Sequence, residues 1–321
     1  MPTPVIIDTD PGLDDALALF IACASPELDI IAVTTVAGNI GLWRTTTNAL
    51  KLLHHLGRDE IPVIAGSAQA LRRGAIEAAP IHGEDGLGGA DLPLPERRPL
   101  ATEASEWMAR ELLRRPSHSV RILALGPLTN VAQLVESRPD AARRLAGIIA
   151  MGGAVREAGN VTQFAEFNIA ADPEAASIVF GSGIAVTLVP LDVTRKVLAD
   201  REWNTTLSAK GGKVAQTAQA LIEAYLRNFE ARVSAKGKNR GALVQPFTPK
   251  FPMHDPCVVL RAIEPGLFGA EALALRVVID RSERDGATVI DSEAGELVEV
   301  LTRVDSGRAL AAILAKLVAL P

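Results

Sequence analysis

The chain has 321 residues, of which 48% are hydrophobic, so it can bury a large core and is short enough to form one domain. Its formal net charge is −5 and no segment is dominated by Lys and Arg, which argues against nucleic acid or an anionic membrane as the main partner. No apolar run approaches the roughly 20 residues that a membrane-spanning helix needs, and Met1-Pro2 precedes an apolar segment without a basic n-region. We therefore expect a single domain over residues 1–321 that acts on a small molecule in the cytoplasm.

Strand-like and helix-like segments alternate along the first two thirds of the chain. Apolar runs typical of buried strands occupy residues 5–7, 28–36, 63–64, 120–125, 148–151 and 185–189. Helix-like segments occupy residues 13–24, 42–56, 102–114, 129–136 and 173–180. This alternation predicts an α/β fold with a mostly parallel, Rossmann-like central sheet that is flanked by helices on both faces.

The last third of the chain follows a different pattern. Residues 198–234 are expected to be mainly helical, and residues 235–253, rich in Lys, Gly and Pro, are interpreted as a mobile segment near the site, with an ordinary solvated loop as the alternative. Residues 273–304 alternate like short antiparallel strands, and residues 306–320 end the chain as a helix. A small antiparallel element is therefore expected near the C-terminus.

Two cysteines, Cys23 and Cys257, form neither a zinc pattern nor a disulfide framework, so each is expected to be a small buried hydrophobic residue.

Four aspartates lie within eight residues in the stretch VIIDTDPGLDDALAL: Asp8, Asp10, Asp14 and Asp15. A Pro-Gly break follows the apolar strand and precedes an apolar helix, so these acids lie at a strand-to-helix turn. Two carboxylates about 5 Å apart repel by about 3 kcal/mol at an effective dielectric constant near 20, and protonation or a divalent cation relieves that cost. Oxygen ligands favour Ca²⁺ or Mg²⁺ over zinc. The helix dipole is an alternative explanation for Asp14 and Asp15, but not for all four acids.

Polar residues also follow other predicted strands, at Gly38-Asn39, Gly126-Pro127 and Gly152-Gly153. Ligands of open α/β sheets collect beyond the carboxyl ends of the strands, so several loops should form one pocket. Asn160, Glu166 and Asn168 lie in one later loop, where amides and a carboxylate suit sugar hydroxyl groups; turn and capping roles are the alternative.

Two histidines stand in less specific contexts. His82 begins HGEDGLGG, which is rich in glycine but lacks the order of a phosphate-binding loop. His254 precedes Asp255-Pro256 and an apolar helix, and the local pattern alone favours Asp255 as a helix N-cap with Pro256 as the first helical residue.

The stretch DTDPGLDD at residues 8–15 resembles the signature of the nucleoside hydrolases, the calcium-dependent N-ribohydrolases. Further matching motifs follow in order over nearly the whole chain: TTVAGN, HGEDGLGG, LALGPLTN, MGGAV, EFNIAADPEAA, VPLDVT and MHDP. The resemblance implies the nucleoside hydrolase fold, hydrolysis of the N-glycosidic bond of ribonucleosides, a place in nucleoside salvage, and a homodimer or homotetramer.

The resemblance also implies roles for individual residues. Asp10, Asp15 and Asp255 would bind Ca²⁺ through their carboxylates, and Leu125 through its backbone carbonyl. Asp14 would be the general base that activates a calcium-bound water. Asp8 would order the metal ligands from behind. The ribose would be held by Asn39, Asn160, Glu166 and Asn168, with Met151 lining the pocket.

His82 and His254 would lie near the nucleobase, where one of them in its protonated form would assist the departing base, a role that requires a pKa near working pH. A histidine at position 82 is compatible with pyrimidine-preferring or nonspecific members. Tyr225, Phe229 and Phe247 are candidate stacking partners of the base, although core positions are favoured for them.

Two other functions are considered. One is a calcium-dependent nucleoside-binding or sugar-binding protein without catalysis. The other is a magnesium-dependent phosphatase of the haloacid dehalogenase type, which Asp8 and Asp10 after a first strand resemble, but Gly12 departs from that signature and Asp14 and Asp15 have no role in it.

Overall fold

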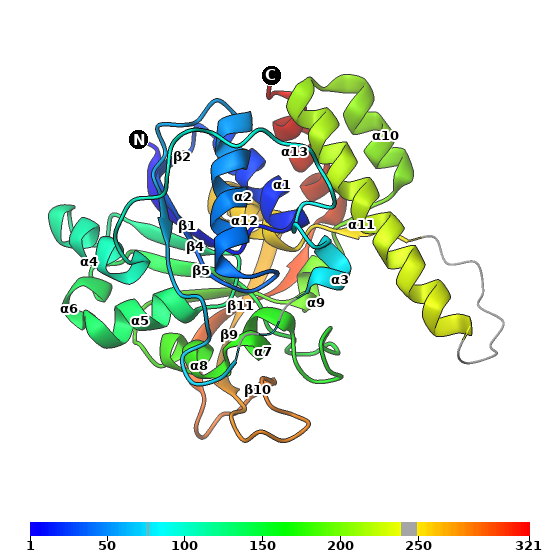
Figure 1. Cartoon of the computed structure of the whole chain (residues 1–321). Helices are drawn as coiled ribbons and strands as arrows, with labels where there is room; N and C mark the ends of the chain where they lie inside the picture. Colours follow the sequence, from blue (N-terminus) through cyan, green and yellow to red (C-terminus); the bar gives the residue numbers. More distant parts are fainter. Residues whose placement is uncertain (75, 77, 239–248) are drawn as a thin grey trace.

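A nine-stranded sheet runs through the centre of the molecule in the computed structural model, which describes residues 1–74, 76, 78–238 and 249–321 (Figure 1). The strand order is β10-β9-β11-β6-β5-β4-β1-β2-β3. All pairs from β11 to β3 are parallel, and β9 and β10 add antiparallel strands at one edge. The strands of this sheet are β1 Thr3–Thr9, β2 Leu28–Thr35, β3 Val63–Ala65, β4 Arg121–Ala124, β5 Gly147–Met151, β6 Val186–Val189, β9 Phe268–Val277, β10 Thr288–Ile290 and β11 Glu296–Val304.

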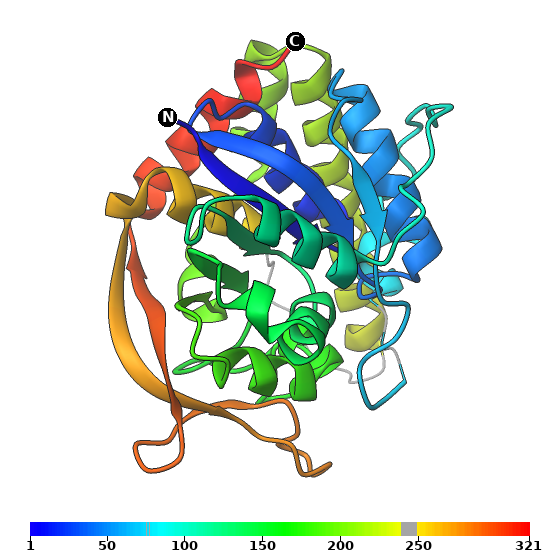
Figure 2. The same cartoon turned by 90° about the vertical axis from the view of Figure 1, so that its left-hand side faces the viewer.

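Helices cover both faces of this sheet (Figures 1 and 2). One group packs with one face, and comprises α1 Leu13–Cys23, α2 Leu42–His55, α11 Lys213–Lys238, α12 His254–Ile263 and α13 Ser306–Val318. A second group packs with the other face, and comprises α4 Ala104–Arg114, α5 Thr129–Ser137, α6 Pro139–Ala142 and α8 Pro173–Phe180. In β1, Val5 and Ile7 pack with the first group while Ile6 packs with the second. A central strand buried on both faces explains the uninterrupted apolar run.

The remaining short elements connect these layers and surround the site. They are α3 Ala79–His82, α7 Phe167–Ala171, α9 Leu191–Thr194, α10 Arg201–Lys210, the 3₁₀ helix η1 Pro265–Leu267, and the strands β7 Leu198–Ala199 and β8 Phe251–Pro252. Strands β7 and β8 pair with each other in an antiparallel two-stranded sheet. Within the described part of the chain, no helix is both long enough and apolar enough to cross a membrane.

The predicted α/β fold with a mostly parallel sheet and a C-terminal antiparallel element is confirmed. The C-terminal strands differ from the expected separate antiparallel element in one respect. Strand β11 pairs with β9 in antiparallel but also with β6 in parallel, so these strands extend the main sheet. The start of the expected helical region is wrong, since residues 198–199 form β7 rather than helix. Of the segment interpreted as mobile, residues 239–248, including Phe247, lie outside the described residues.

Candidate active site

The turn between β1 and α1 is built around the carboxylate of Asp15. One of its oxygens accepts hydrogen bonds from the Thr9 hydroxyl and the Asp10 backbone N–H, and the other accepts from the Gly12 backbone N–H at 2.9 Å and the Asn39 amide at 3.0 Å. Asp15 therefore caps the first turn of α1 by bonding back to the residue before the helix. These contacts fix the direction of its carboxylate.

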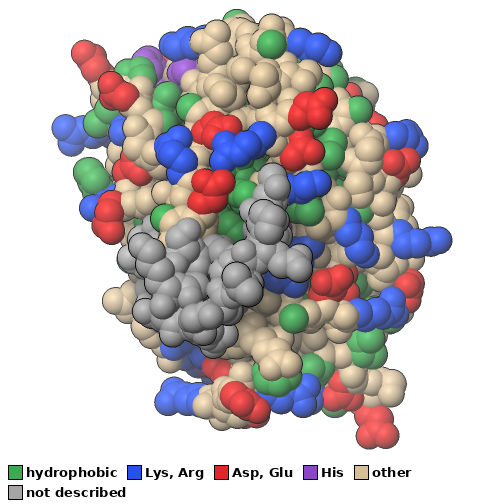
Figure 3. All heavy atoms as spheres, turned by 90° about the vertical axis from the view of Figure 1, so that its right-hand side faces the viewer, with side chains coloured by type: hydrophobic (Ala, Val, Ile, Leu, Met, Phe, Trp, Pro, Cys, Tyr) green, Lys and Arg blue, Asp and Glu red, His purple; other side chains and the backbone are tan. Residues whose placement is uncertain are grey.

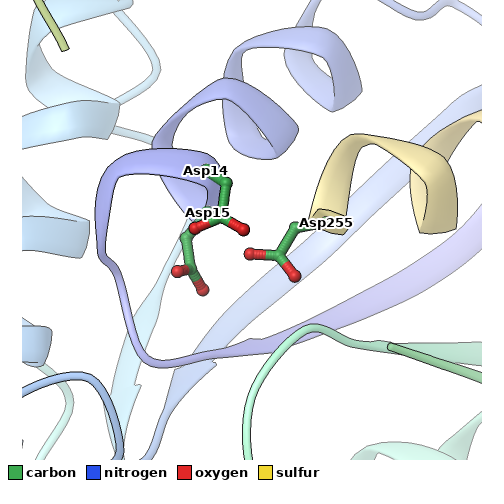
Figure 4. Close-up of side chains that lie close together, drawn as sticks. All are labelled: Asp14, Asp15 and Asp255. Carbon is green, nitrogen blue, oxygen red and sulfur yellow. The ribbon is translucent and has the colours of Figure 1, made fainter. Parts of the chain in front are cut away.

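Asp14, Asp15 and Asp255 bring their carboxylates together where the first turns of α1 and α12 meet (Figure 4). One oxygen from each lies within 4.8 Å of the others. The capping interpretation of Asp255 is wrong, because α12 begins at His254, preceded by Met253, and Asp255 lies inside its first turn. That position directs the carboxylate toward the acids of α1 instead of toward its own helix backbone.

Asp10 lies beside this group of three acids, in a space that two glycines leave open. A Cβ atom on Gly38 or on Gly126 would overlap the Asp10 carboxylate. The backbone N–H of Asn39 donates to the same carboxylate at 2.6 Å. Loops that follow β1, β2 and β4 thus converge around one buried acid, as expected at the carboxyl edge of a parallel sheet.

Burial and mutual repulsion make these acids hard to ionise. Burial first, and then the charge of Asp15, raises the pKa of Asp14 to about 8. Burial raises the pKa values of Asp10 and Asp255 well above their usual range, and the neighbouring aspartates add to the effect. A divalent cation removes this electrostatic cost, and a set of carboxylate oxygens suits a hard ion. The donor set therefore fits a metal of the calcium or magnesium type.

A cavity of about 680 Å³ opens in front of the acids. Its volume lies within the range of small-molecule sites. Most of the predicted site residues line it: Asp14, Asn39, His82, Leu125, Met151, Asn160, Glu166, Asn168, His254 and Asp255. Asp10 and Asp15 are buried and do not line the cavity.

On one wall, Asn168 joins the loop after β4 to the last residue of β5. Its amide donates to the Leu125 carbonyl at 2.7 Å and to the Met151 carbonyl at 3.2 Å. Glu166 is the N-cap of α7 and accepts from the backbone N–H groups of Asn168 and Ile169, so the capping interpretation is confirmed for it. Both side chains line the cavity as well, which places polar atoms on rigid supports at its surface.

The two histidines differ from the expectation of a pKa near working pH. The His82 ring accepts a hydrogen bond through Nδ1 from the Leu13 backbone N–H at 3.1 Å, and burial lowers its pKa to about 4. His254 shares a 2.7 Å hydrogen bond between Nδ1 and the Thr194 hydroxyl, and burial, followed by the charge of Arg195, lowers its pKa to about 3. Burial therefore favours the neutral form of both imidazoles.

Asp8 lies within β1, two residues before Asp10. One carboxylate oxygen accepts from the Thr34 hydroxyl and from the Asn130 amide at 2.8 Å, while the other has no hydrogen-bond partner among the described residues. Its backbone carbonyl accepts from the Leu125 N–H at 2.7 Å. Burial raises its pKa to about 6. Asp8 thus joins β1 to the loop that carries Leu125.

Arg195 and Leu198 in the cavity wall escaped the sequence analysis, whereas Lys250, Phe251 and Pro252 belong to the segment that was expected near the site but were not singled out. No local motif marks them, because β7 and β8 are two-residue strands from distant parts of the chain. Core positions were favoured for Tyr225 and Phe229, but both side chains also line the cavity. The rings of Tyr225 and Phe251 pack edge to face, with 4.9 Å between their centroids.

An acid cluster suited to a cation, beside a polar cavity at the carboxyl edge of a parallel sheet, defines an α/β enzyme with a metal-dependent site. The family model for inosine-uridine preferring nucleoside hydrolases matches residues 5–311. The chain belongs to this family and is a ribonucleoside hydrolase, so the phosphatase and non-catalytic alternatives are wrong.

Individual relatives cover most of the chain. It is 42% identical to the pyrimidine-specific ribonucleoside hydrolase RihA of Citrobacter koseri over 91% of this chain and 89% of that protein, and 41% identical to its counterpart in Photobacterium profundum over the same shares. Among solved structures, the plant nucleoside hydrolase PpNRh1 has a TM-score of 0.91 at 34% identity, covering 99% of this chain and 100% of that one. A purine-preferring ribonucleoside hydrolase from Gardnerella vaginalis has a TM-score of 0.89 at 27% identity, covering 99% and 98%.

Proposed function

We propose that this enzyme hydrolyses pyrimidine ribonucleosides to the free base and ribose, and that it does so with Ca²⁺ bound by Asp10, Asp15, Asp255 and the Leu125 carbonyl. The observation that carries the proposal is the convergence of Asp14, Asp15 and Asp255, of which Asp14 and Asp255 line the cavity. When bound, the cation supplies charge that lowers the pKa of an attached water and orients it.

Asp14 acts as the general base in this proposal. Its carboxylate lines the cavity, whereas the Asp15 carboxylate is occupied by four hydrogen bonds. A nearby cation favours the ionised form of Asp14 and so returns its pKa toward the working range. Asp14 then takes a proton from the water while the water oxygen approaches the anomeric carbon of the ribose.

The sugar lies against Asn39, Met151, Asn160, Glu166 and Asn168 in this proposal. The polar side chains of this set already have structural partners: for example, Asn160 accepts from the Phe167 N–H at 2.9 Å and Glu166 caps α7. Such contacts hold the polar atoms in fixed positions, which favours a sugar pre-oriented for attack. The imidazoles of His82 and His254 contact the base, and His82, whose Nδ1 accepts from the Leu13 N–H, does so as a hydrogen-bond donor through Nε2.

The preference for pyrimidines rests on the relatives. The two RihA proteins above are described as pyrimidine-specific at 41% and 42% identity, whereas the purine-preferring structure is only 27% identical. The histidine at position 82, which lines the cavity, agrees with that choice.

We also propose that residues 1–321 act as one domain, that the enzyme serves nucleoside salvage in the cytoplasm, and that it forms a homodimer or homotetramer. The single sheet that joins β1 to β11 supports the first part. On the described part of the face at the right of Figure 1, Lys and Arg side chains are interspersed with Asp and Glu (Figure 3), which supports a small-molecule substrate rather than nucleic acid.

Release of free ribose from uridine, cytidine, inosine, adenosine and guanosine tests the proposal. We expect the pyrimidine nucleosides to be hydrolysed fastest, and we expect Asp14→Asn to lose activity on all five. Faster hydrolysis of a purine nucleoside would contradict the base preference, and an active Asp14→Asn variant would contradict the role of Asp14.

A further inference from the structure

The cavity carries charged side chains of both signs. Its carboxylates are Asp14, Glu166 and Asp255, and its cations are Arg195 and Lys250. The carboxylates fit the metal and the sugar, but neither cation has a role in the proposed reaction. Two positive groups in the wall of a substrate cavity therefore call for a chemical explanation.

Both cations flank the small sheet formed by β7 and β8. Arg195 follows α9, whose last residue, Thr194, bonds to the His254 ring. Lys250 directly precedes β8, and His254 follows β8 after one intervening residue. The Met253 N–H donates to the Val197 carbonyl at 2.9 Å and ties the two segments together. The cations thus lie on the side of the cavity that carries His254, the side proposed for the base.

The Arg195 guanidinium is held in place, and its single salt bridge among the described residues, to Glu157, is long and partly exposed. It donates to the backbone carbonyls of Ala158 and Gly159, and its nearest carboxylate, Glu157, lies 3.7 Å away. Two of its five N–H groups are used in this way, which leaves donors for a ligand. Lys250 is exposed and makes no salt bridge to any other residue within the described ranges.

Hydrolysis places negative charge on the departing base. The bond between C1′ and the base nitrogen breaks, and its electron pair goes to that nitrogen and spreads onto the carbonyl oxygens of the pyrimidine. The water oxygen bonds to C1′ while its proton goes to Asp14. The base then needs either a proton or a nearby positive charge.

The histidines are poorly placed to supply that positive charge. The Nδ1 atom of His82 is the acceptor for the Leu13 N–H at the start of α1, so that nitrogen carries no proton while the bond exists. The Nδ1 atom of His254 is engaged with the Thr194 hydroxyl at 2.7 Å, so only its Nε2 atom is available to the base.

We propose that the pyrimidine base departs as an anion and that the guanidinium of Arg195 and the ammonium of Lys250 stabilise its charge in the transition state. The anion takes a proton from water after it is released. This inference rests on the proposed function, since it concerns the leaving group of the same reaction.

The test compares single-turnover rates on uridine, 5-methyluridine and 5-fluorouridine. Fluorine withdraws electrons and makes the base a more stable anion, whereas the methyl group has the opposite effect. We expect Lys250→Met and Arg195→Met to slow the hydrolysis of uridine and 5-methyluridine about tenfold or more relative to that of 5-fluorouridine. Without the cation, the rate depends more steeply on the stability of the departing base as an anion.

Two further variants separate charge from structure. Lys196→Met removes the same charge from an exposed neighbour that does not line the cavity, and should leave the ratio of rates between the three substrates unchanged. Arg195→Lys keeps the charge but loses the paired contacts with Ala158 and Gly159, so KM should rise while the ratio of rates stays near that of the wild type.

Equal slowing of all three substrates by both Met variants would overturn the inference, because a merely structural role affects every substrate alike. That result leaves the proposed function intact, since the wild-type enzyme would still release ribose. If the wild-type enzyme released no ribose from any of the three, the proposed function itself would fail, and the inference with it.

Discussion

The side-chain amide of Asn168 donates a 2.7 Å hydrogen bond to the backbone carbonyl of Leu125. One of these residues is proposed to hold the sugar and the other to bind calcium. Both line the cavity. The hydrogen bond therefore joins the substrate-binding wall to the metal site.

Replacing Asn168 with Ala should weaken calcium binding as well as activity. The Leu125 carbonyl loses the group that orients it, and loss of such a supporting partner typically lowers metal affinity by about 10-fold to 100-fold. Calorimetric titration of the metal-free protein with Ca²⁺ measures the effect. Asn160→Ala is the control, because Asn160 bonds to the Phe167 N–H and not to Leu125. Unchanged calcium affinity in Asn168→Ala would show that the bond does not support the metal site.

The stability of the metal-free protein should depend on Asp14 and on pH. The pKa of this carboxyl rises from 3.8 in the unfolded chain to about 8 in the folded protein. Between these values the folded protein retains a proton that the unfolded chain has lost, so the free energy of unfolding falls as pH rises through this window, by up to about 1.4 kcal/mol per pH unit.

Urea unfolding of the metal-free wild type and of Asp14→Asn, at pH 5 and pH 8, measures this dependence. The variant lacks the titrating group, so its stability relative to the wild type should increase from pH 5 to pH 8. Ca²⁺ should stabilise the wild type more at pH 8 than at pH 5. An equal stability difference between the two proteins at both pH values would contradict the assignment.

Gly126 should be essential for the metal site because it leaves room for Asp10. In Gly126→Ala, the new Cβ would overlap the Asp10 carboxylate and displace it. We expect a loss of calcium affinity of at least about tenfold, as for other ligand-orienting changes. Gly266→Ala is the matched control, since no atom lies within 4 Å of its added Cβ. Calcium binding by Gly126→Ala at the affinity of the wild type would mean that Asp10 is not a ligand.

Arg73 should contribute to stability away from the site. It pairs with both Glu174 and Asp285 and so joins the loop after β3 to α8 and to the turn between β9 and β10. These side chains are largely buried. Arg73→Ala should lower the free energy of unfolding by about 2–3 kcal/mol, because the substitution leaves two carboxylates without their cationic partner. Arg110→Ala breaks an exposed pair and should cost much less. Equal losses in urea unfolding would contradict this view.

The turn after β1 could be predicted from the sequence because its signals are local. An apolar run, a Pro-Gly break and a helical period place Asp14 and Asp15 at the start of a helix, where the structure has them. The meeting of those acids with Asp255 could not be derived in this way. It depends on the packing of α12 beside α1, and only the family resemblance indicated it.

The state of the histidines and the far wall of the cavity could not be predicted either. The pKa of His254 reflects burial and the charge of Arg195, neither of which a local pattern contains. Strands β7 and β8 have two residues each, which is too short for a periodic signal. The sequence pattern therefore does not identify Arg195 and Lys250 individually as cavity residues; packing of the folded chain places them there.

The most direct test of the central claim measures ribose release from uridine after the metal is removed, and again after Ca²⁺ is restored. The account predicts that removal with a strong chelator abolishes activity, that Ca²⁺ restores it, and that Asp14→Asn binds Ca²⁺ yet releases no ribose. Full activity of the wild type in the presence of the chelator would contradict it.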